Sequence, residues 1–325
     1  MVDPGQILFA CLLDGKSESP ALMPCDASQA ARDDRLAWIH LDGAHADTRN
    51  WLDQEVDYLD SIILDALLAS ETRPRLLEFE SGLMLILRGV NLDEHADPED
   101  MVSLRLWIDP YRIISVQYRE VKAVEEMQAH YAVQSGPTSP GAFLADLVER
   151  MTGRLKPVIA EMQDSLDALE ESVLHAPDHD HRRTVSTIRR QAIMFRRHLA
   201  PQREVLVSLR TASIAWLEQV EKRRLQESLD RLMRYVEDLE AIRDRAQLVK
   251  EELAQTVAER MNANLYKLSV VAAFFLPLGV IAGVLGANLG GIPGADHPLA
   301  FAIFLGILAG VVGLQVIVFR LLKWI

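Results

Sequence analysis

The chain has 325 residues, which is enough for about two domains, and its net charge is −13. Nucleic acid binding needs a basic surface, so we expect no nucleic acid partner. Two cysteines, Cys11 and Cys25, are too few for a disulfide framework or a four-cysteine zinc site. We expect both thiols to be buried apolar groups in a reducing compartment.

Residues 1–135 are predicted to form an α/β cytoplasmic domain. The N-terminus lacks the basic and apolar regions of a secretory signal, so this part should stay in the cytoplasm. Asp60–Ser70 is expected to be a helix, and short apolar runs predict six strands: Ile7–Leu13, Ala37–Leu41, Leu76–Glu80, Leu83–Arg88, Val102–Ile108 and Arg112–Tyr118. No phosphate-binding loop or nucleophile–base pair is recognisable in the sequence, which argues against an enzyme.

Residues 136–212 are predicted to form an antiparallel helical hairpin in the cytoplasm. Residues 157–181 are rich in acids and residues 182–210 are rich in arginine, so the two arms have complementary faces. The turn between the arms contains three histidines and two aspartates: His175, Asp178, His179, Asp180 and His181. Imidazole and carboxylate groups bind zinc, but a solvated loop at a helix start explains the same residues and is the favoured interpretation.

Residues 213–287 are predicted to form one long helix that continues into the first membrane span. An apolar stripe repeats at steps of mostly three and four: Leu225, Leu229, Leu232, Val236, Leu239, Ile242, Ala246, Val249 and Leu253. Between residues 214 and 276 there is no glycine or proline to end the helix. Pro277 can kink it within the bilayer.

Two charge-free segments, Leu268–Ala287 and Pro298–Phe319, are each long enough to cross a membrane. Lysines and arginines lie before the first segment and after the second, which places both termini in the cytoplasm. Residues 288–297 then form an extracytoplasmic loop, and residues 298–325 form the second transmembrane helix and a basic cytoplasmic tail. A pair of buried core helices is the alternative for such segments.

Two helices cannot enclose a path for an ion, so transport requires several copies of the chain around an axis. One face of the long helix combines an amide, a hydroxyl, leucines and glycines, as a pore lining does: Asn262, Leu265, Ser269, Leu276, Gly279 and Gly283. Helix packing also favours small residues, so the sequence leaves both interpretations open. Gly286, Ala287 and Asn288 begin a glycine-rich segment. Its carbonyl and amide oxygens can bind a cation, but the same residue types are also typical of an ordinary turn.

At Gly286, Ala287 and Asn288 the chain resembles the CorA metal-ion transporter family, which has a Gly-Met-Asn signature at this position. The residues that follow, and the Thr-Arg-Pro-Arg run at 72–75, resemble its zinc transport protein (ZntB) branch. The resemblance implies a funnel-shaped homopentamer with long helices, in which the first span lines an axial pore. It implies that Gly286, Ala287 and Asn288 form the pore entrance. It also implies that four residues of the face described above lie on the pore side: Asn262, Leu265, Leu276 and Gly279. It also implies that Arg320 and Lys323 belong to a basic collar.

The resemblance implies transport of zinc or related divalent cations across the bacterial inner membrane. It also implies that membrane lipid surrounds the protein and that no cofactor is needed. Ala287 replaces the methionine of the signature, and the following loop retains only Asp296, beside His297, as candidate cation-binding groups. Proton coupling is expected for the zinc branch, yet neither span contains Asp, Glu or His. The alternatives are a magnesium or cobalt channel of the main branch and a membrane-anchored scaffold that transports nothing.

Overall fold

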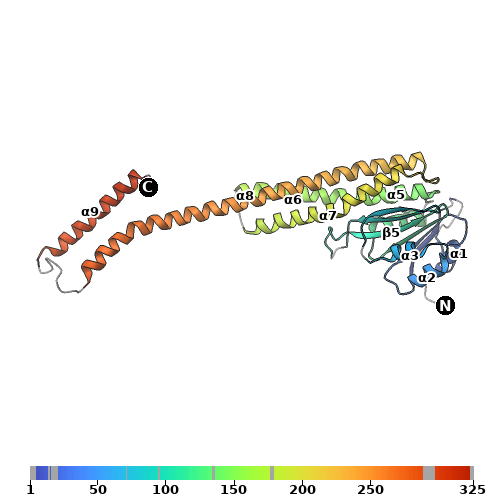
Figure 1. The fold of residues 1–325 in the computed structure, drawn as a ribbon, viewed down its shortest axis with the longest axis horizontal. Coiled ribbons are helices and arrows are strands. Elements are labelled where there is room, and N and C mark those ends of the chain that lie inside the picture. Colours follow the sequence, from blue (N-terminus) through green and yellow to red (C-terminus); the bar gives the residue numbers. More distant parts are fainter. Residues whose placement is uncertain are drawn as a thin grey trace. The chain divides into compact units, whose positions relative to one another are not determined.

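The computed structural model describes residues 5–13, 15, 21–70, 72–93, 96–133, 136–175, 179–287 and 297–322. The chain divides into two compact units, Met1–Lys250 and Glu251–Ile325. The described elements follow the chain in this order (Figure 1): β1 (Ile7–Leu12), α1 (Pro24–Ala30), β2 (Ala37–Asp42), α2 (Thr48–Glu55), α3 (Ser61–Leu68), β3 (Arg75–Glu78), β4 (Leu83–Gly89), β5 (Val102–Ile108), β6 (Arg112–Gln117), α4 (Lys122–Val133), α5 (Pro140–Gly153), α6 (Leu155–His175), α7 (His179–Thr211), α8 (Gln219–Gly286) and α9 (Ala300–Leu321).

The strands of the first unit form one mixed sheet in the order β1-β2-β6-β5-β4-β3. β2 and β6 run parallel, and the other neighbouring pairs are antiparallel. The six predicted strands are all present, with ends within two residues of the predicted ranges, and α3 confirms the predicted helix. Helices α1, α2 and α4 were not predicted, because they are short or weakly amphipathic.

Helices cover both faces of the sheet (Figure 1). Ile39 and Leu41 belong to a core cluster that joins the sheet to α1, α2 and α3. Trp38 points to the opposite face, because successive side chains of a strand alternate between its two sides. Its ring packs against Phe143 of α5 and Tyr131 of α4, with centroids 5.0 and 6.0 Å apart. Apolar residues on both faces of β2 are therefore required for this three-layer arrangement.

Cys11 is fully buried in β1, and burial raises the pKa of its thiol to about 12. The expectation of a buried, unreactive thiol is confirmed for this residue, since a thiol that stays protonated is a poor nucleophile and metal ligand. The side chain of Cys25 lies outside the described residues.

His40 is a buried histidine on the same face of β2 as Trp38. Its Nδ1 lies 2.7 Å from the Ser115 hydroxyl oxygen, which also accepts a hydrogen bond of 2.8 Å from Nε1 of Trp38. Complete burial lowers the pKa of His40 from 6.5 to about 4, against a smaller opposing effect of Gln117. The folded protein therefore holds His40 in its neutral form at physiological pH.

Acidification should destabilise the first unit through His40. The unfolded chain takes up a proton at pH values near 6.5, whereas folded His40 does so only near 4. The contribution of neutral His40 to stability is thus complete above pH 6.5 and falls by up to about 3 kcal/mol between those two values. Thermal unfolding of the detergent-solubilised protein, followed by tryptophan fluorescence, should show this loss. It should be smaller in His40→Leu, and an identical pH profile in the variant would contradict the assignment.

The helical part of the first unit begins at α5, whose N-terminus is capped by Ser139. The Ser139 hydroxyl accepts a 3.1 Å hydrogen bond from the amide of Ala142, and Pro140 occupies the first turn. Helices α6 and α7 lie where the sequence predicted the two hairpin arms, and α7 ends at Thr211, one residue before the predicted end of the hairpin region. Helix α8 confirms the predicted long helix, and all nine residues of its apolar stripe are buried.

The charged arms of the hairpin pair with α8 more than the sequence predicted. Arg245 of α8 forms ion pairs of 2.6 Å with Asp167 and with Glu170 of α6, and Arg196 of α7 pairs with Glu240 of α8 at 2.6 Å. The expected complementarity between α6 and α7 is thus satisfied through the long helix, because α8 supplies arginine and glutamate of its own. Since these pairs are largely exposed, each contributes little stability but fixes which faces meet.

Candidate ion pathway

Two helices of the structure are long and apolar enough to cross a membrane: α8, through its C-terminal part, and α9. Their most apolar stretches have mean hydropathy values of 2.5 and 2.6, and no residue of either stretch is buried within the chain. Leu268, Leu276 and Phe301 are at least 65% exposed. A continuous apolar surface of this kind requires lipid or further copies of the chain to cover it.

Helix α9 contacts α8 at Phe274. The side-chain amide of Gln315 donates a 3.2 Å hydrogen bond to the carbonyl oxygen of Phe274, and the rings of Phe274 and Phe319 lie 6.1 Å apart. The shielded residues of α9 repeat at steps of mostly three and four, as one stripe of a helix does: Ala300, Phe304, Leu308, Val311, Val312, Gln315 and Phe319. On α8 the partly shielded residues gather on the side of Phe274: Val270, Ala273, Phe274, Leu278 and Ile281.

The predicted pore-lining residues lie on the opposite side of α8. At about 100° per residue, the direction of Leu276, Gly279 and Gly283 is roughly 140–200° away from that of Phe274. Every member of the predicted set is exposed in the described chain: Asn262, Leu265, Ser269, Leu276, Gly279 and Gly283. Helix α9 therefore covers one side of α8 and leaves this polar and small-residue side uncovered.

An open apolar groove of about 460 Å³ lies on the uncovered side. Its lining residues are Ala272, Phe275, Leu276, Gly279 and Val280. No atom would lie within 4 Å of a Cβ added at Gly279 or Gly283, and the same holds for Gly306 and Gly310 of α9. The two Gly-x-x-x-Gly motifs are thus not used for packing within the described chain, and both remain available to other copies.

The predicted pore entrance is only partly described. Gly286 is the last residue of α8 and Ala287 follows it. Asn288 and Asp296 lie outside the described residues. The structure therefore places the first two entrance residues at the end of the membrane-length helix, and the role of Asn288 stays a prediction.

His297 occupies the turn before α9. Its Nδ1 accepts a 3.2 Å hydrogen bond from the amide of Leu299, and its carbonyl accepts one of 2.9 Å from Ala300. A neutral ring whose Nδ1 accepts a hydrogen bond carries its proton on Nε2, so His297 must give up this hydrogen bond before it can bind a metal. It can then supply one ligand and cannot form a site by itself. In the described part of the chain, no three His, Cys, Asp or Glu side chains come together as a metal site.

The histidines of the hairpin turn are described only in part. Nε2 of His181 lies 3.3 Å from the hydroxyl of Ser172, a contact between α7 and α6. The side chains of His175 and His179 lie outside the described residues. One of the three predicted ligands thus contacts α6 through one ring nitrogen, and a metal-binding role of the turn stays a prediction.

The predicted basic collar has one described member. Arg320 lies in the last turn of α9 and is exposed, where its charge is favourable beside the C-terminal end of the helix. Lys323 lies outside the described residues.

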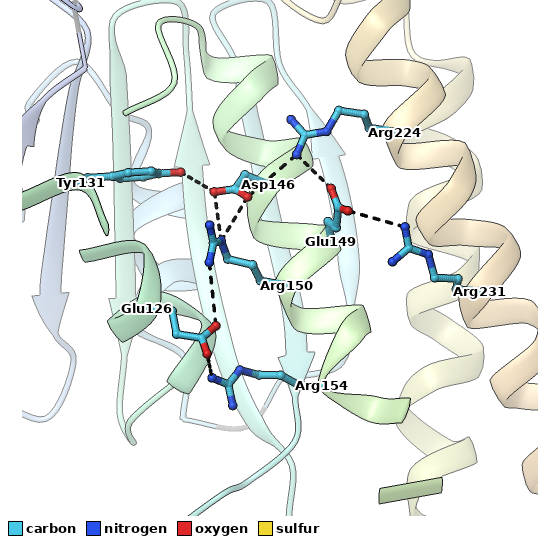
Figure 2. A network of polar contacts seen from close by, with 8 residues as sticks. All are labelled: Glu126, Tyr131, Asp146, Glu149, Arg150, Arg154, Arg224 and Arg231. Atoms are coloured by element: carbon cyan, nitrogen blue, oxygen red, sulfur yellow. Dashed lines mark hydrogen bonds and ion pairs between the residues drawn. The ribbon is translucent and has the colours of Figure 1, made fainter. Parts of the chain in front are cut away.

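A network of ion pairs joins the first part of α8 to α5, and Figure 2 shows it from close by. Glu149 of α5 lies 2.9 Å from Arg224 and 3.6 Å from Arg231, both on α8. Asp146 accepts a 2.6 Å hydrogen bond from Tyr131 of α4 and pairs with Arg150 at 3.1 Å. The α/β layer is thus connected through α5 to the base of the long helix.

Sequence reasoning did not identify this network or the contact between Gln315 and Phe274. The pair Asp146 and Arg150 has the spacing of neighbours on a helix, which is a usable signal. The contact between Gln315 and Phe274 and the ion pairs between α5 and α8 join residues 41 to 82 positions apart, and only the tertiary structure brings them together. Gln315 is a polar residue within an apolar segment, but its partner is a backbone carbonyl, which no sequence pattern reveals.

In the described part of the chain, a large polar unit is followed by two helices of membrane length. Comparisons with known proteins define the class of protein to which this arrangement belongs. A family model described as CorA-like Mg²⁺ transporter protein matches residues 33–321. The chain belongs to this family and is a divalent cation transporter. Membership favours the transport interpretations over the membrane-anchored scaffold.

Among its relatives is the divalent cation transporter CmaX of Pseudomonas aeruginosa, which is 37% identical over 89% of this chain and 87% of its own length. The zinc transport protein ZntB of Yersinia enterocolitica is 32% identical over 91% of this chain and 89% of its own. The structure of full-length CmaX superimposes with a TM-score of 0.85 at 34% identity, covering 99% of both chains. This similarity confirms the predicted fold class of an α/β domain, a long-helix bundle and two C-terminal membrane helices.

Proposed function

We propose that this protein transports zinc(II) across the bacterial inner membrane through the axial pore of a homopentamer. The 32% identity to zinc transport protein ZntB over nine tenths of the chain supports the choice of zinc. The segment after Ala287 and the Thr-Arg-Pro-Arg run resemble that branch as well. The family resemblance supports the pentamer.

One observation carries the proposal: the face of α8 opposite α9 is uncovered. Asn262 and Ser269 supply an amide and a hydroxyl on this face. When several copies surround an axis, the Leu265 side chains of all copies form one apolar ring around it, and the Leu276 side chains form another. Polar groups replace part of the water shell of an ion, whereas leucine rings close a pore by excluding water. Helix α9 then lies outside the ring of α8 helices, against lipid.

The charges at the ends of the spans support an orientation with both termini in the cytoplasm. Arg260 and Lys267 precede the first span, and Arg320 and Lys323 follow the second. The loop that contains Asn288 and Asp296 would then face the other side of the membrane, where a ring of carboxylates attracts cations. His297 can add one ring nitrogen to this ring of carboxylates once its hydrogen bond with the Leu299 amide is broken.

Proton coupling, if it exists here, must use groups outside the two spans. Neither Leu268–Ala287 nor Pro298–Phe319 contains Asp, Glu or His, the usual groups of a proton relay within the bilayer. The extracytoplasmic loop, the cytoplasmic unit and water along the pore are the remaining routes.

A second candidate is a transporter of broader cation range, including magnesium or cobalt. The 37% identity to the divalent cation transporter CmaX favours it. Uptake into liposomes that contain the purified protein and a trapped zinc-sensitive dye separates the two candidates. The experiment is run with and without an imposed proton gradient, and with excess magnesium outside.

Zinc uptake that resists excess magnesium is the expected result, and a response to the gradient would establish coupling. If excess magnesium blocks zinc uptake and the proton gradient has no effect on it, the second candidate function is correct.

A further inference from the structure

Gln315 lies within an apolar helix, and its side chain faces α8. It is the only strongly polar side chain between Pro298 and Phe319. Within α9 it shares the partly shielded stripe with Phe304, Leu308 and Phe319 rather than the exposed side. In hydrocarbon, a polar group without a partner is costly, so an amide at this position needs a specific contact.

The contact is directional. Nε2 of Gln315 donates to the carbonyl oxygen of Phe274 at 3.2 Å. A carbonyl only accepts hydrogen bonds, so the nitrogen of the amide and not its oxygen must face Phe274. The carbonyl has two lone pairs and can accept this bond in addition to one within its own helix. Oε1 of Gln315 is buried and has no partner among the described residues.

The carbonyl that Gln315 binds lies beside an interruption in the backbone hydrogen bonds of α8. Pro277 is inside the helix and has no amide hydrogen, so the carbonyl of Ala273 loses its helical partner. The proline ring also crowds the preceding turn, which weakens the helix locally and favours a bend. Phe274 is the next residue after Ala273, so Gln315 attaches α9 to the turn that the proline weakens.

We propose that Gln315 is a positioning residue that fixes α8 at Pro277 and so determines which face of α8 is left for the ion path. Attachment at Phe274 turns that side of α8 toward α9 and directs Leu276 and Gly279 away from it. The ring contact between Phe274 and Phe319 attaches α9 to the same residue of α8. This inference rests on the proposed function, in that the face opposite α9 lines the pore.

A double-mutant cycle with zinc uptake as the readout tests the inference. Gln315→Met keeps the length of the side chain and removes the donor, and Pro277→Ala restores the missing amide of the helix. We expect Gln315→Met to lower the maximal rate at least about threefold without changing half-saturation, because no cation-binding group is altered. In the Pro277→Ala background the same exchange should change the rate less than about twofold.

A second measurement does not depend on transport. Spin labels at Val284→Cys and Ile303→Cys, in a background with alanine at Cys11 and Cys25, report the distance between α8 and α9 beyond Pro277. The distance distribution should broaden in Gln315→Met and should be restored toward the original by Pro277→Ala. Both labelled positions are exposed, so the labels leave the contact at Phe274 intact.

The outcomes distinguish this inference from the proposed function. The positioning role would be overturned by unchanged label distances or by unchanged uptake in Gln315→Met. It would also be overturned if Gln315→Met lowered the uptake rate by the same factor with and without Pro277→Ala. A fall in oligomer size or thermal midpoint that fully accounts for the lost rate would also overturn it, since it would show a merely structural role. Absence of zinc uptake by the unaltered protein would instead reject the proposed function, and the label distances would still decide the role of Gln315.

Discussion

Asn288→Ala is expected to reduce zinc uptake about 10- to 100-fold while leaving assembly intact. The exchange removes an amide oxygen from each copy at the proposed entrance, and a polar contact to a charged group contributes about 1.5–3 kcal/mol, which corresponds to this range of rates. We expect assembly to be unaffected because the exchange removes a small amide group and no apolar packing surface. Uptake into proteoliposomes and size-exclusion chromatography in detergent measure the two quantities.

Asn264→Ala is the matched control for this variant. Asn264 is an exposed asparagine of α8 that lies off the proposed pore face, so its exchange should leave uptake unchanged. Normal uptake in Asn288→Ala, or equal losses in the two variants, would contradict the assignment of Asn288 to the entrance.

Gly279→Leu is expected to reduce uptake to less than about a tenth of the unaltered rate. Gly279 lies on the uncovered side of α8 and lines the groove there, so a leucine in every copy would extend apolar side chains toward the proposed axis. Within one chain a Cβ at this position meets no atom within 4 Å, and the monomer should therefore fold normally. Any effect must arise in the pore or between copies.

Gly313→Leu is the corresponding control on α9. It introduces the same side chain at an exposed glycine that is also free of neighbours within 4 Å, but on the helix that we place against lipid. We expect it to retain most of the uptake. Full activity in Gly279→Leu would show that this face lines neither the pore nor a contact between copies.

Much of the fold could be predicted because its signals are local. Strands such as β5 are short apolar runs between polar residues, and β5 was found with accurate ends. The stripe from Leu225 to Leu253 has the period of a helix and lies within α8, although α8 begins six residues after the predicted start at residue 213. The two membrane segments follow from length and lack of charge alone. The pattern of small and polar residues on α8 predicted a distinct face, and the structure shows that this face lies opposite the contact with α9.

The remaining features depend on which elements meet in space. The acids of α6 were expected to face the arginines of α7, but Asp167 and Glu170 pair with Arg245 of α8, because a third helix competes for them. The attachment of Gln315 to a carbonyl 41 residues away leaves no trace in the sequence. The choice of zinc cannot follow from Gly286 and Ala287 either, since backbone oxygens bind many cations.

Thiol accessibility during transport tests directly whether the ion path runs along the uncovered face of α8. Leu276→Cys and Leu314→Cys are made in a background with alanine at Cys11 and Cys25, since both leucines are more than 60% exposed within the chain. A positively charged methanethiosulfonate reagent is added to proteoliposomes during zinc uptake. We expect the reagent to stop uptake through Leu276→Cys, zinc to slow this reaction, and uptake through Leu314→Cys to be unaffected. Block at Leu314→Cys without block at Leu276→Cys would contradict it and place the path on α9.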